Sequence, residues 1–114
     1  MKVKNNEGFI AVGDLRKKIQ KKEDFTLLDV RTADEYKTGH IQGAISFNMS
    51  EDFLRDLGKS GLDKKKKSSV IVYCRNGSRS QIVFNVLKLL NFKDVLDMKE
   101  GLLEWKKNKL PLTK

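Results

Sequence analysis

Residues 69–90, SVIVYCRNGSRSQIVFNVLKLL, decide the fold of this chain. The segment 69–73 is a short apolar run rich in β-branched residues, which is typical of a buried strand. A loop containing Gly77 follows, and after it apolar residues recur at the spacing of one broad helical face. That face comprises Ile82, Val83, Val86, Leu87 and Leu90, and Asn91 can take the left-handed conformation that ends a helix. A strand, a tight loop and a buried helix in this order predict a β-α unit of a parallel sheet.

The same alternation of short apolar runs and helical patterns continues on both sides of this segment. The expected strands are 9–10, 25–30, 44–48, 69–73 and 95–98. The expected helices lie around 12–19, 33–37, 53–57, 82–90 and 102–107, with Gly39 as the stop of the second and Ser50 as the cap of the third. Residues 58–67 are polar and rich in lysine, which predicts a loop. The pattern favours one α/β domain over residues 1–114, with a mostly parallel central sheet of about five strands.

Basic residues dominate the charge of the chain. Lysine and arginine number 24 against 15 aspartate and glutamate, so the formal net charge is +9, which favours anionic ligands or partners. The aromatic residues are scattered at core-like positions rather than interleaved with basic ones, which argues against a stacking platform for nucleic acid. The lysine run 64–67 is expected to be a solvated segment. We therefore expect no nucleic-acid partner.

The hydropathy pattern contains no membrane signal. No stretch approaches the ~20 apolar residues that cross a bilayer, and residues 1–10 lack the apolar core of a secretory signal. We expect no membrane association and a cytoplasmic location, although an exported protein whose signal had been removed would have the same features.

Cys74 is the only cysteine, which excludes an internal disulfide framework and a zinc cage of several cysteines. There is also a single histidine and no glycine pattern for a nucleotide, so no metal and no organic cofactor are expected. The thiol itself could be a buried bystander, a reactive group or one half of an intermolecular bridge.

The position of Cys74 favours a reactive thiol. It follows the predicted strand and precedes a helix N-terminus, the place where open α/β sheets bind ligands. The positive end of the helix dipole and the side chains of Arg75 and Arg79 favour an anion there. Cysteine pKa values fall to ~3.5–7.5 in such surroundings, so we predict that Cys74 is largely ionised at neutral pH.

The residues after Cys74 can form a nest of main-chain donors. Gly77 permits the positive φ that a tight loop requires, so the N–H groups of residues 75–80 could surround a central anion. Ser78 and Ser80 could add hydroxyl donors, and either serine could instead cap the helix. Asn76 completes the loop.

This loop resembles the active-site loop of the rhodanese family, and the resemblance covers nearly the whole chain. The first family signature is similar to Leu28-Asp29-Val30-Arg31, Glu35-Tyr36, Gly39-His40-Ile41, Gly43-Ala44 and Asn48, the catalytic one to residues 73–80, and the C-terminal one to Gly101, Leu102, Trp105 and Pro111. Two positions depart from the family pattern. Glu100 stands where the family usually has the first of two glycines, and Lys109 stands where a glycine is common.

The resemblance implies a parallel sheet flanked by helices on both faces and a ping-pong sulfurtransferase. Cys74 would take the outer sulfur of thiosulfate, a polysulfide or a persulfide and pass it to a thiol, to cyanide or to an acceptor protein. The loop from Arg75 to Ser80 would bind the thiolate and the persulfide. Arg75 and Arg79 would position the anionic donor, with Arg79 in the place that contacts departing sulfite.

Other charged residues near this site have a simpler structural explanation. Asp29, Arg31 and Glu35 are interpreted as a buried ion-pair set that fixes the first strand and the helix after it. A structural role is also favoured for His40, because no carboxylate or metal partner is visible for it.

Two alternative functions remain at this stage. A dual-specificity phosphatase would need arginine six residues after the cysteine, but Ser80 holds that position and Arg79 comes one residue early. The second alternative is a non-catalytic rhodanese-like interaction module, or a sulfur carrier that a partner loads and unloads. Cys74 with its two arginines argues against an inactive module but does not separate a carrier from an enzyme.

Overall fold

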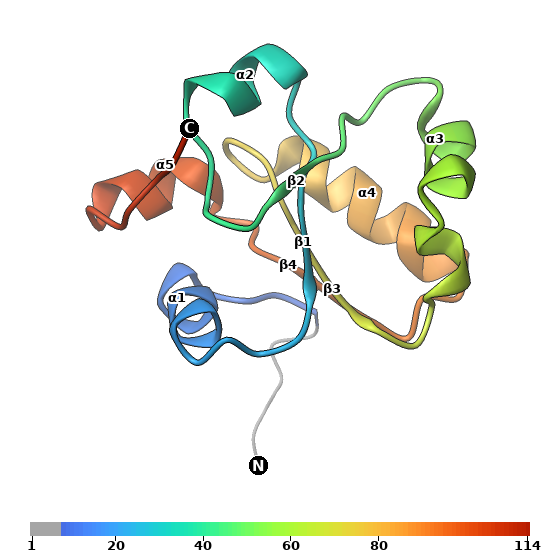
Figure 1. The fold of residues 1–114 in the computed structure, drawn as a ribbon, viewed down its shortest axis with the longest axis horizontal. Coiled ribbons are helices and arrows are strands. Elements are labelled where there is room, and N and C mark those ends of the chain that lie inside the picture. Colours follow the sequence, from blue (N-terminus) through green and yellow to red (C-terminus); the bar gives the residue numbers. More distant parts are fainter. Residues whose placement is uncertain (1–7) are drawn as a thin grey trace.

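The computed structural model describes residues 8–114 and shows an α/β fold built on a parallel sheet (Figure 1). The elements in chain order are α1 (Val12–Gln20), β1 (Thr26–Asp29), α2 (Ala33–Thr38), β2 (Ile45–Ser46), α3 (Phe53–Ser60), the 3₁₀ turn η1 (Leu62–Lys64), β3 (Ser69–Tyr73), α4 (Ser78–Leu89), β4 (Asp94–Asp97) and α5 (Gly101–Lys107). Strands and helices alternate as the sequence predicts.

The described residues form one sheet of four parallel strands in the order β2-β1-β3-β4. The register places Asp29 beside Tyr73 and Val72 beside Asp97, so the carboxyl ends of β1, β3 and β4 lie along one edge. From β1 the chain moves to β2 on one side and then returns to β3 on the other. The edge between β1 and β3 is therefore the topological switch point, where sheets of this kind bind ligands.

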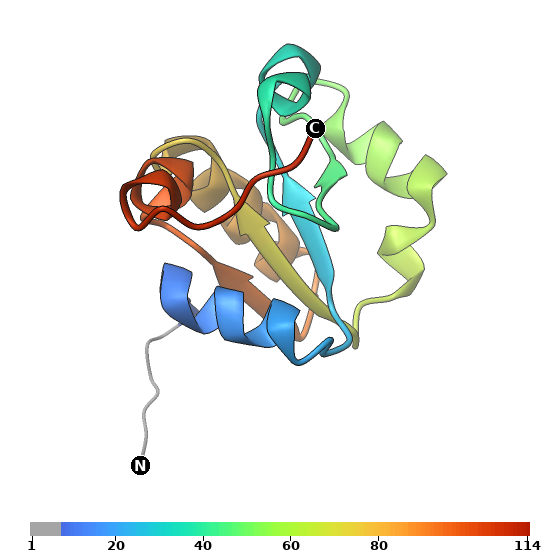
Figure 2. The same ribbon diagram turned by 60° about the vertical axis from the view of Figure 1, so that its left-hand side comes forward.

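Helices cover both faces of the sheet, as expected, and create two apolar cores (Figure 2). One core packs α3 and α4 against one face and includes Phe53, Leu87 and Phe92. The other packs α1 and α5 against the opposite face and includes Leu15 and Trp105. Successive residues of β3 alternate between the two cores, because side chains of a strand point to opposite faces in turn. Packing on both faces of the sheet therefore fixes the position of β3 and of the residues that follow it.

Three predicted elements differ in the structure. The expected first strand at residues 9–10 forms only an isolated parallel bridge between Phe9 and Asp97, so the sheet of the described chain has four strands and not five. The strand expected at 44–48 shortens to β2. The segment 58–67 is not simply a loop, because α3 continues to Ser60 and η1 follows. There Leu62 is buried in the α3–α4 core, a tertiary contact that outweighs the polar composition.

Helix ends agree with the sequence in part. Asn91 has φ 72°, the left-handed stop expected after α4. Gly39 ends α2, but with φ 150° and ψ 136° rather than a left-handed helical geometry. Ser50 does not cap α3, because that helix begins at Phe53 and the Ser50 hydroxyl oxygen instead accepts the Asp52 N–H at 3.2 Å.

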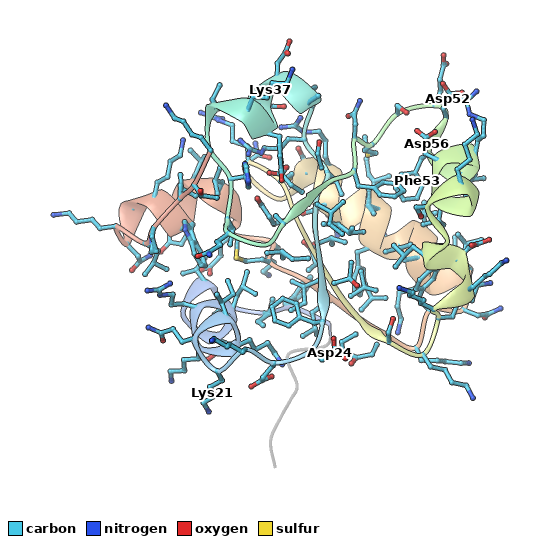
Figure 3. All side chains as sticks on the ribbon, in the orientation of Figure 1. Lys21, Asp24, Lys37, Asp52, Phe53 and Asp56 are labelled. Atoms are coloured by element: carbon cyan, nitrogen blue, oxygen red, sulfur yellow. The ribbon has the colours of Figure 1, made fainter. Side chains whose placement is uncertain are left out.

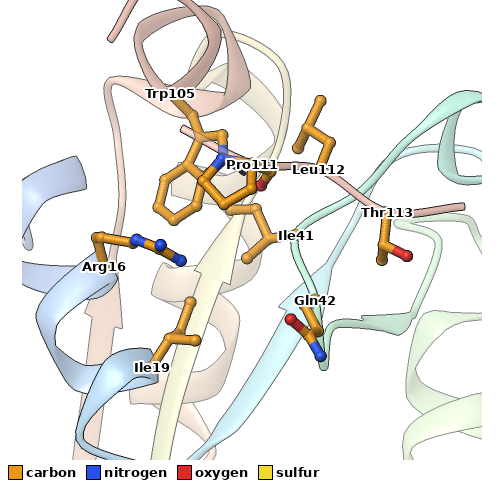
Figure 4. Close-up of a pocket in the computed structure, with 8 residues that line it drawn as sticks. All are labelled: Arg16, Ile19, Ile41, Gln42, Trp105, Pro111, Leu112 and Thr113. Atoms are coloured by element: carbon orange, nitrogen blue, oxygen red, sulfur yellow. Dashed lines mark hydrogen bonds between the residues drawn. The ribbon is translucent and has the colours of Figure 1, made fainter. Parts of the chain in front are cut away.

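The C-terminal segment closes the α1–α5 face. Thr113 and His40 exchange main-chain hydrogen bonds at 2.8 and 2.9 Å, and the Trp105 indole N–H donates to the Pro111 carbonyl at 2.9 Å. A pocket of ≈ 40 Å³ remains between this segment and α1, lined by Arg16, Ile19 and Trp105 among others (Figure 4). Its size suits about one water molecule, so we assign it no ligand.

Charged side chains project from the outer faces of the helices and turns (Figure 3). Lys21 and Asp24 lie just after α1, Lys37 lies on α2, and Asp52 and Asp56 lie at the start of α3. Within residues 8–114, the helices are too short or too polar to cross a membrane.

Candidate active site at the end of strand β3

Cys74 directly follows β3, at the switch point between β1 and β3. Its side chain lies on the α4 face of the sheet, in the same core as Val72 and Val83. Helix α4 begins four residues later at Ser78, and the Ser80 N–H of its first turn donates to the sulfur, so the helix N-terminus is directed at Cys74. The strand, the loop and the helix predicted from residues 69–90 therefore place Cys74 where the sequence indicated.

Two main-chain N–H groups converge on the sulfur. Gly77 N–H donates to Cys74 Sγ at 3.1 Å and Ser80 N–H donates to it at 3.3 Å. Gly77 has φ 98°, the positive φ expected of it, which turns its N–H inward. The Ser78 N–H is not part of this cradle, because it donates to Asn76 Oδ1 at 3.1 Å. The nest is thus narrower than the run of donors from Arg75 to Ser80 that the sequence suggested.

Asn76, and not a serine, supplies the side chain that bonds to the first amide of α4. Asn76 Oδ1 accepts from both the main-chain N–H and the hydroxyl of Ser78, at 3.1 and 2.9 Å. The Ser80 hydroxyl turns back to the Gly77 carbonyl at 3.3 Å. Neither serine therefore takes the capping role that the sequence left open, since Gly77 occupies the N-cap position and Asn76 satisfies the free amide that follows.

The loop is locked against the start of α5. A Cβ at Gly77 would overlap the Lys99 carbonyl, and a Cβ at Gly101 would overlap the Arg75 carbonyl. Leu102 N–H donates to the Cys74 carbonyl at 2.9 Å, and the next amide donates to the Arg75 carbonyl at 3.0 Å. Two glycines thus allow two main-chain segments to touch, and this contact fixes the direction of the loop amides.

Glu100 and Lys109, the two positions that depart from the rhodanese pattern, lie at the two ends of α5. Gly101 has φ 75° and makes the close contact, whereas Glu100 has φ −68° and an ordinary helical conformation. One glycine is therefore sufficient here. Lys109 has φ 58°, so a lysine occupies a left-handed position that suits glycine better.

Cys74 is fully buried, with 0% of its surface exposed. Hydrocarbon side chains surround much of it, yet two N–H groups point directly at the sulfur. A bystander thiol in a core lacks such donors, so the arrangement suits a sulfur that carries negative charge. Because the sulfur has no exposed surface, a molecule that reacts with it reaches it only after neighbouring side chains move.

Arg79 and Glu35 form an ion pair across the site. The Arg79 guanidinium donates to both oxygens of Glu35, at 2.7 and 3.1 Å. This hydrogen bond, with smaller effects from Thr32, holds the pKa of Glu35 at about 2, and it also raises the pKa of Arg79. The sequence suggested that Glu35 belongs to one ion-pair set with Asp29 and Arg31. In the structure Glu35 pairs with Arg79 instead, because it lies on α2 opposite the first turn of α4. Its carboxylate and the Thr32 hydroxyl also form the capping box that starts α2.

Asp29 and Arg31 form the expected buried ion pair. The Arg31 guanidinium contacts both oxygens of Asp29, the shortest distance being 2.7 Å, and also donates to the Gly39 carbonyl. Burial opposes the charge of Arg31, but the hydrogen bond and attraction to Asp29 leave its pKa above the ordinary value. The Tyr73 hydroxyl donates to Asp29 at 2.7 Å and accepts from the Ile41 N–H. Burial, followed by the nearby Asp29, raises the pKa of Tyr73 far above its usual value.

His40 and Arg75 lie differently around this network. The His40 ring stacks on Tyr36 at a centroid distance of 3.6 Å, and its Nδ1 lies 2.9 Å from the Tyr36 carbonyl oxygen. These contacts agree with the structural interpretation. Arg75 is exposed beside the loop.

Asp97 is a buried residue near the site that sequence reasoning missed. It ends β4, is 0% exposed, and neither carboxyl oxygen has a hydrogen-bond partner among the described residues. Burial raises the pKa of Asp97 to about 6, against smaller opposing effects from the Ser80 hydroxyl and Lys99. A charged residue in the expected strand 95–98 was the available signal, but the sequence did not show which face it occupies.

Comparisons with known proteins identify the family that the sequence resembles. Residues 11–108 match the family model of the rhodanese-like domain. The uncharacterized protein YibN of Escherichia coli K12 is 36% identical over 93 residues, which are 82% of this chain and 64% of YibN, so the chain spans less than two thirds of that relative. The thiosulfate sulfurtransferase GlpE of Coxiella burnetii is 36% identical over 86 residues, covering 75% of this chain and 76% of GlpE. The crystal structure of the Alr3790 protein from Anabaena sp. superposes with a TM-score of 0.79 and 28% identity, over 91% of this chain and 90% of that one.

The parallel sheet and the cysteine loop at its carboxyl edge define an α/β protein with a main-chain cradle around one sulfur. With the match over residues 11–108, this chain belongs to the rhodanese-like domain family.

Proposed function

We propose that this protein is a sulfurtransferase in which Cys74 carries a sulfane sulfur as a persulfide. The convergence of the Gly77 and Ser80 N–H groups on Cys74 Sγ is the observation that supports it most. Preorganised donors of this kind stabilise an anion without having to reorient during the reaction. The likeness to the thiosulfate sulfurtransferase GlpE supports the same activity.

In the first step the Cys74 thiolate attacks the outer sulfur of a donor such as thiosulfate. An Sγ–S bond forms, the S–S bond of thiosulfate breaks, and sulfite leaves with the electron pair. The negative charge moves from Sγ to the outer sulfur of the new persulfide. The Gly77 and Ser80 amides donate to Cys74 Sγ. This atom carries the negative charge before the step, and after the step it is bonded to the outer sulfur, which then carries the charge.

In the second step an acceptor thiolate or cyanide attacks the outer sulfur of the persulfide. The Sγ–S bond breaks, Cys74 leaves as a thiolate, and the acceptor keeps the sulfur. The same two amides stabilise this leaving group, so one cradle serves both displacements.

The arginines divide the task of donor binding. Arg75 is exposed beside the loop and meets an anionic donor first. Arg79 is engaged by Glu35, so a donor oxyanion binds Arg79 only by displacing that carboxylate or by sharing the guanidinium with it. Donors without a bulky oxyanion, such as polysulfides and persulfides, avoid this competition.

A passive sulfur carrier is the second candidate, and the burial of Cys74 favours it. A sulfur with no exposed surface needs an opening motion, which a partner protein could induce when it loads or unloads the persulfide. The same residues would hold the sulfur in either case.

Intact mass spectrometry tests the proposal. The protein is mixed with thiosulfate, polysulfide or glutathione persulfide, and Cys74→Ser is treated in parallel. We expect a gain of one sulfur on the wild type that is absent in the variant and that disappears when a thiol acceptor is added. Repeated turnover with free thiols supports an enzyme, and a single stable load supports a carrier. An unmodified wild type with all three donors contradicts both.

A further inference from the structure

The Asp97 carboxyl is buried near the active-site loop, and neither of its oxygens makes a hydrogen bond among the described residues. An unpaired buried carboxylate is costly, so natural proteins rarely keep one without a reason. Its main-chain groups, in contrast, are satisfied by Gly8 and Ile10 at 2.7 and 3.1 Å.

Asp97 lies on the same side of the sheet as Cys74. In β4 the side chains alternate, and Val95 belongs to the core on the α4 face, so Asp97 two residues later points to that face. Its neighbour in β3 is Val72, which is also in that core and lies two residues before Cys74. The first turn of α4 covers both positions.

Ser80 connects the carboxyl to the sulfur. Its main-chain N–H donates to Cys74 Sγ at 3.3 Å, and its hydroxyl is close enough to Asp97 to lower the pKa of that carboxyl. The hydroxyl now makes a long hydrogen bond of 3.3 Å to the Gly77 carbonyl. Ser80 is therefore the residue that links the Asp97 carboxyl to the Cys74 sulfur.

Few other charged groups face Asp97. From the end of its own strand, Lys99 attracts the carboxylate, but the Lys99 ammonium lies 4.2 Å from the centroid of the Phe9 ring. Directly after β3, Cys74 lies on this face, whereas Tyr73 points to the other core. From α4, Arg79 is held by Glu35. Cys74 is therefore the ionisable thiol on the same face of the sheet as Asp97, and Ser80 lies next to both.

We infer that Asp97 is a positioning residue for the Cys74 loop and that its charge is coupled through Ser80 to the charge on the sulfur. The inference rests on the proposed function in that it takes Cys74 to be a reactive thiolate. Two anions in one region of low dielectric repel each other, so ionised Asp97 disfavours the Cys74 anion, and protonated Asp97 permits it. The coupling is reciprocal, so charge on the sulfur also keeps the proton on Asp97.

The pH profile of Cys74 alkylation by iodoacetamide tests this coupling. Rates are measured from pH 4.5 to 9 for the wild type, Asp97→Asn and Ser80→Ala. Asp94→Asn, an exposed carboxyl at the other end of β4, is the matched control. We expect Asp97→Asn to match the wild type at pH 4.5 and to react about threefold faster above pH 6, until both reach their plateau.

The two remaining variants sharpen the result. In Ser80→Ala the amide donor to the sulfur is kept, but the hydroxyl that lowers the pKa of Asp97 is gone, so the difference from Asp97→Asn should begin at higher pH. Asp94→Asn should follow the wild type throughout. Coincident profiles for the wild type and a folded Asp97→Asn would overturn the inference.

A second measurement needs no change at Asp97. The carboxyl ¹³C signal of Asp97 is titrated by NMR in the wild type and in Cys74→Ser, with Asp94 as an internal reference. We expect a higher midpoint for Asp97 in the wild type, and equal midpoints would overturn the coupling. Neither the alkylation profile nor the NMR titration uses a sulfur donor. Failure to form a persulfide would therefore contradict the proposed function, whereas these two measurements would still test the coupling between Asp97 and Cys74.

Discussion

Two buried carboxyls lie on either side of strand β3, and they differ in every contact. Asp29 ends β1 and Asp97 ends β4, and both are 0% exposed. Asp29 accepts hydrogen bonds from the Arg31 main chain, the Arg31 guanidinium and the Tyr73 hydroxyl. Asp97 accepts none among the described residues. The same residue type at the same edge of one sheet therefore meets opposite electrostatic surroundings.

The difference teaches how the two sides of the site are used. The paired carboxylate ties β1 to the segment after it and to β3, so it belongs to the scaffold that holds the sheet edge. Burial raises the pKa of the unpaired one to about 6, close to physiological pH, and the Ser80 hydroxyl in the first turn of α4 opposes this shift. One side of the site is held by an ion pair and hydrogen bonds, and the other carries a carboxyl whose pKa is raised by burial.

Removing the charge of Asp29 should have the largest effect. Asp29→Asn leaves the buried Arg31 guanidinium without its counter-ion, and breaking a buried pair in this way costs about 3–5 kcal/mol. We expect a corresponding fall in the free energy of unfolding, measured by urea denaturation. Asp94→Asn, with the same chemical change at an exposed position, should cost far less. Similar losses for both variants would show that the pair does not hold the scaffold.

Separating the loop from α5 should have the next largest effect. Gly101→Ala places a methyl group against the Arg75 carbonyl at a residue with φ 75°, so we expect a loss of about 2–4 kcal/mol and weaker persulfide formation. Gly58→Ala is the matched control. Gly58 lies inside α3 with open space around it, so alanine there should stabilise the protein by about 0.5–1 kcal/mol.

Asp97→Asn should show the opposite pH dependence from that of a paired acid. The folded state holds the Asp97 proton more tightly than the unfolded chain, so this residue lowers stability progressively as the pH rises from about 4 through about 6. The difference in free energy of unfolding, variant minus wild type, should therefore increase by about 1–2 kcal/mol between pH 4 and pH 7. A difference that is constant over this range would contradict the raised pKa.

Glu35→Gln should have the smallest effect on stability and a selective effect on function. Glu35 has a pKa of about 2 instead of 4.5, so its pair with Arg79 contributes fully above pH 4.5 and is lost as the pH falls toward 2. The pair is part-exposed, so we expect a loss of about 1 kcal/mol at pH 7. The variant frees Arg79, and kcat/KM for thiosulfate should rise relative to kcat/KM for polysulfide. An unchanged ratio would remove Glu35 from donor selection.

Local sequence signals were sufficient to predict the α/β fold and the position of Cys74 between a strand and a helix. The apolar run 69–73, Gly77 and the helical pattern before Asn91 define a strand, a turn and a helix through short-range preferences, and each element is present. The predicted buried stripe is narrower than expected, because Ile82 is exposed and only Val83 and Leu87 of it are fully buried. The expected strand at 9–10 failed because two residues beside a sheet edge gain too little pairing to extend it. Leu62 became helical through burial, which local composition does not encode.

The sequence by itself determined that a cysteine follows a buried strand and precedes a helix, because hydrophobic period and glycine position are local properties. Only the tertiary structure decided which charges meet across the site. Glu35 contacts Arg79 across 44 positions, and Asp97 faces Ser80 rather than solvent. Such pairings depend on strand order and on which face a side chain occupies, and both follow from the packing of distant segments.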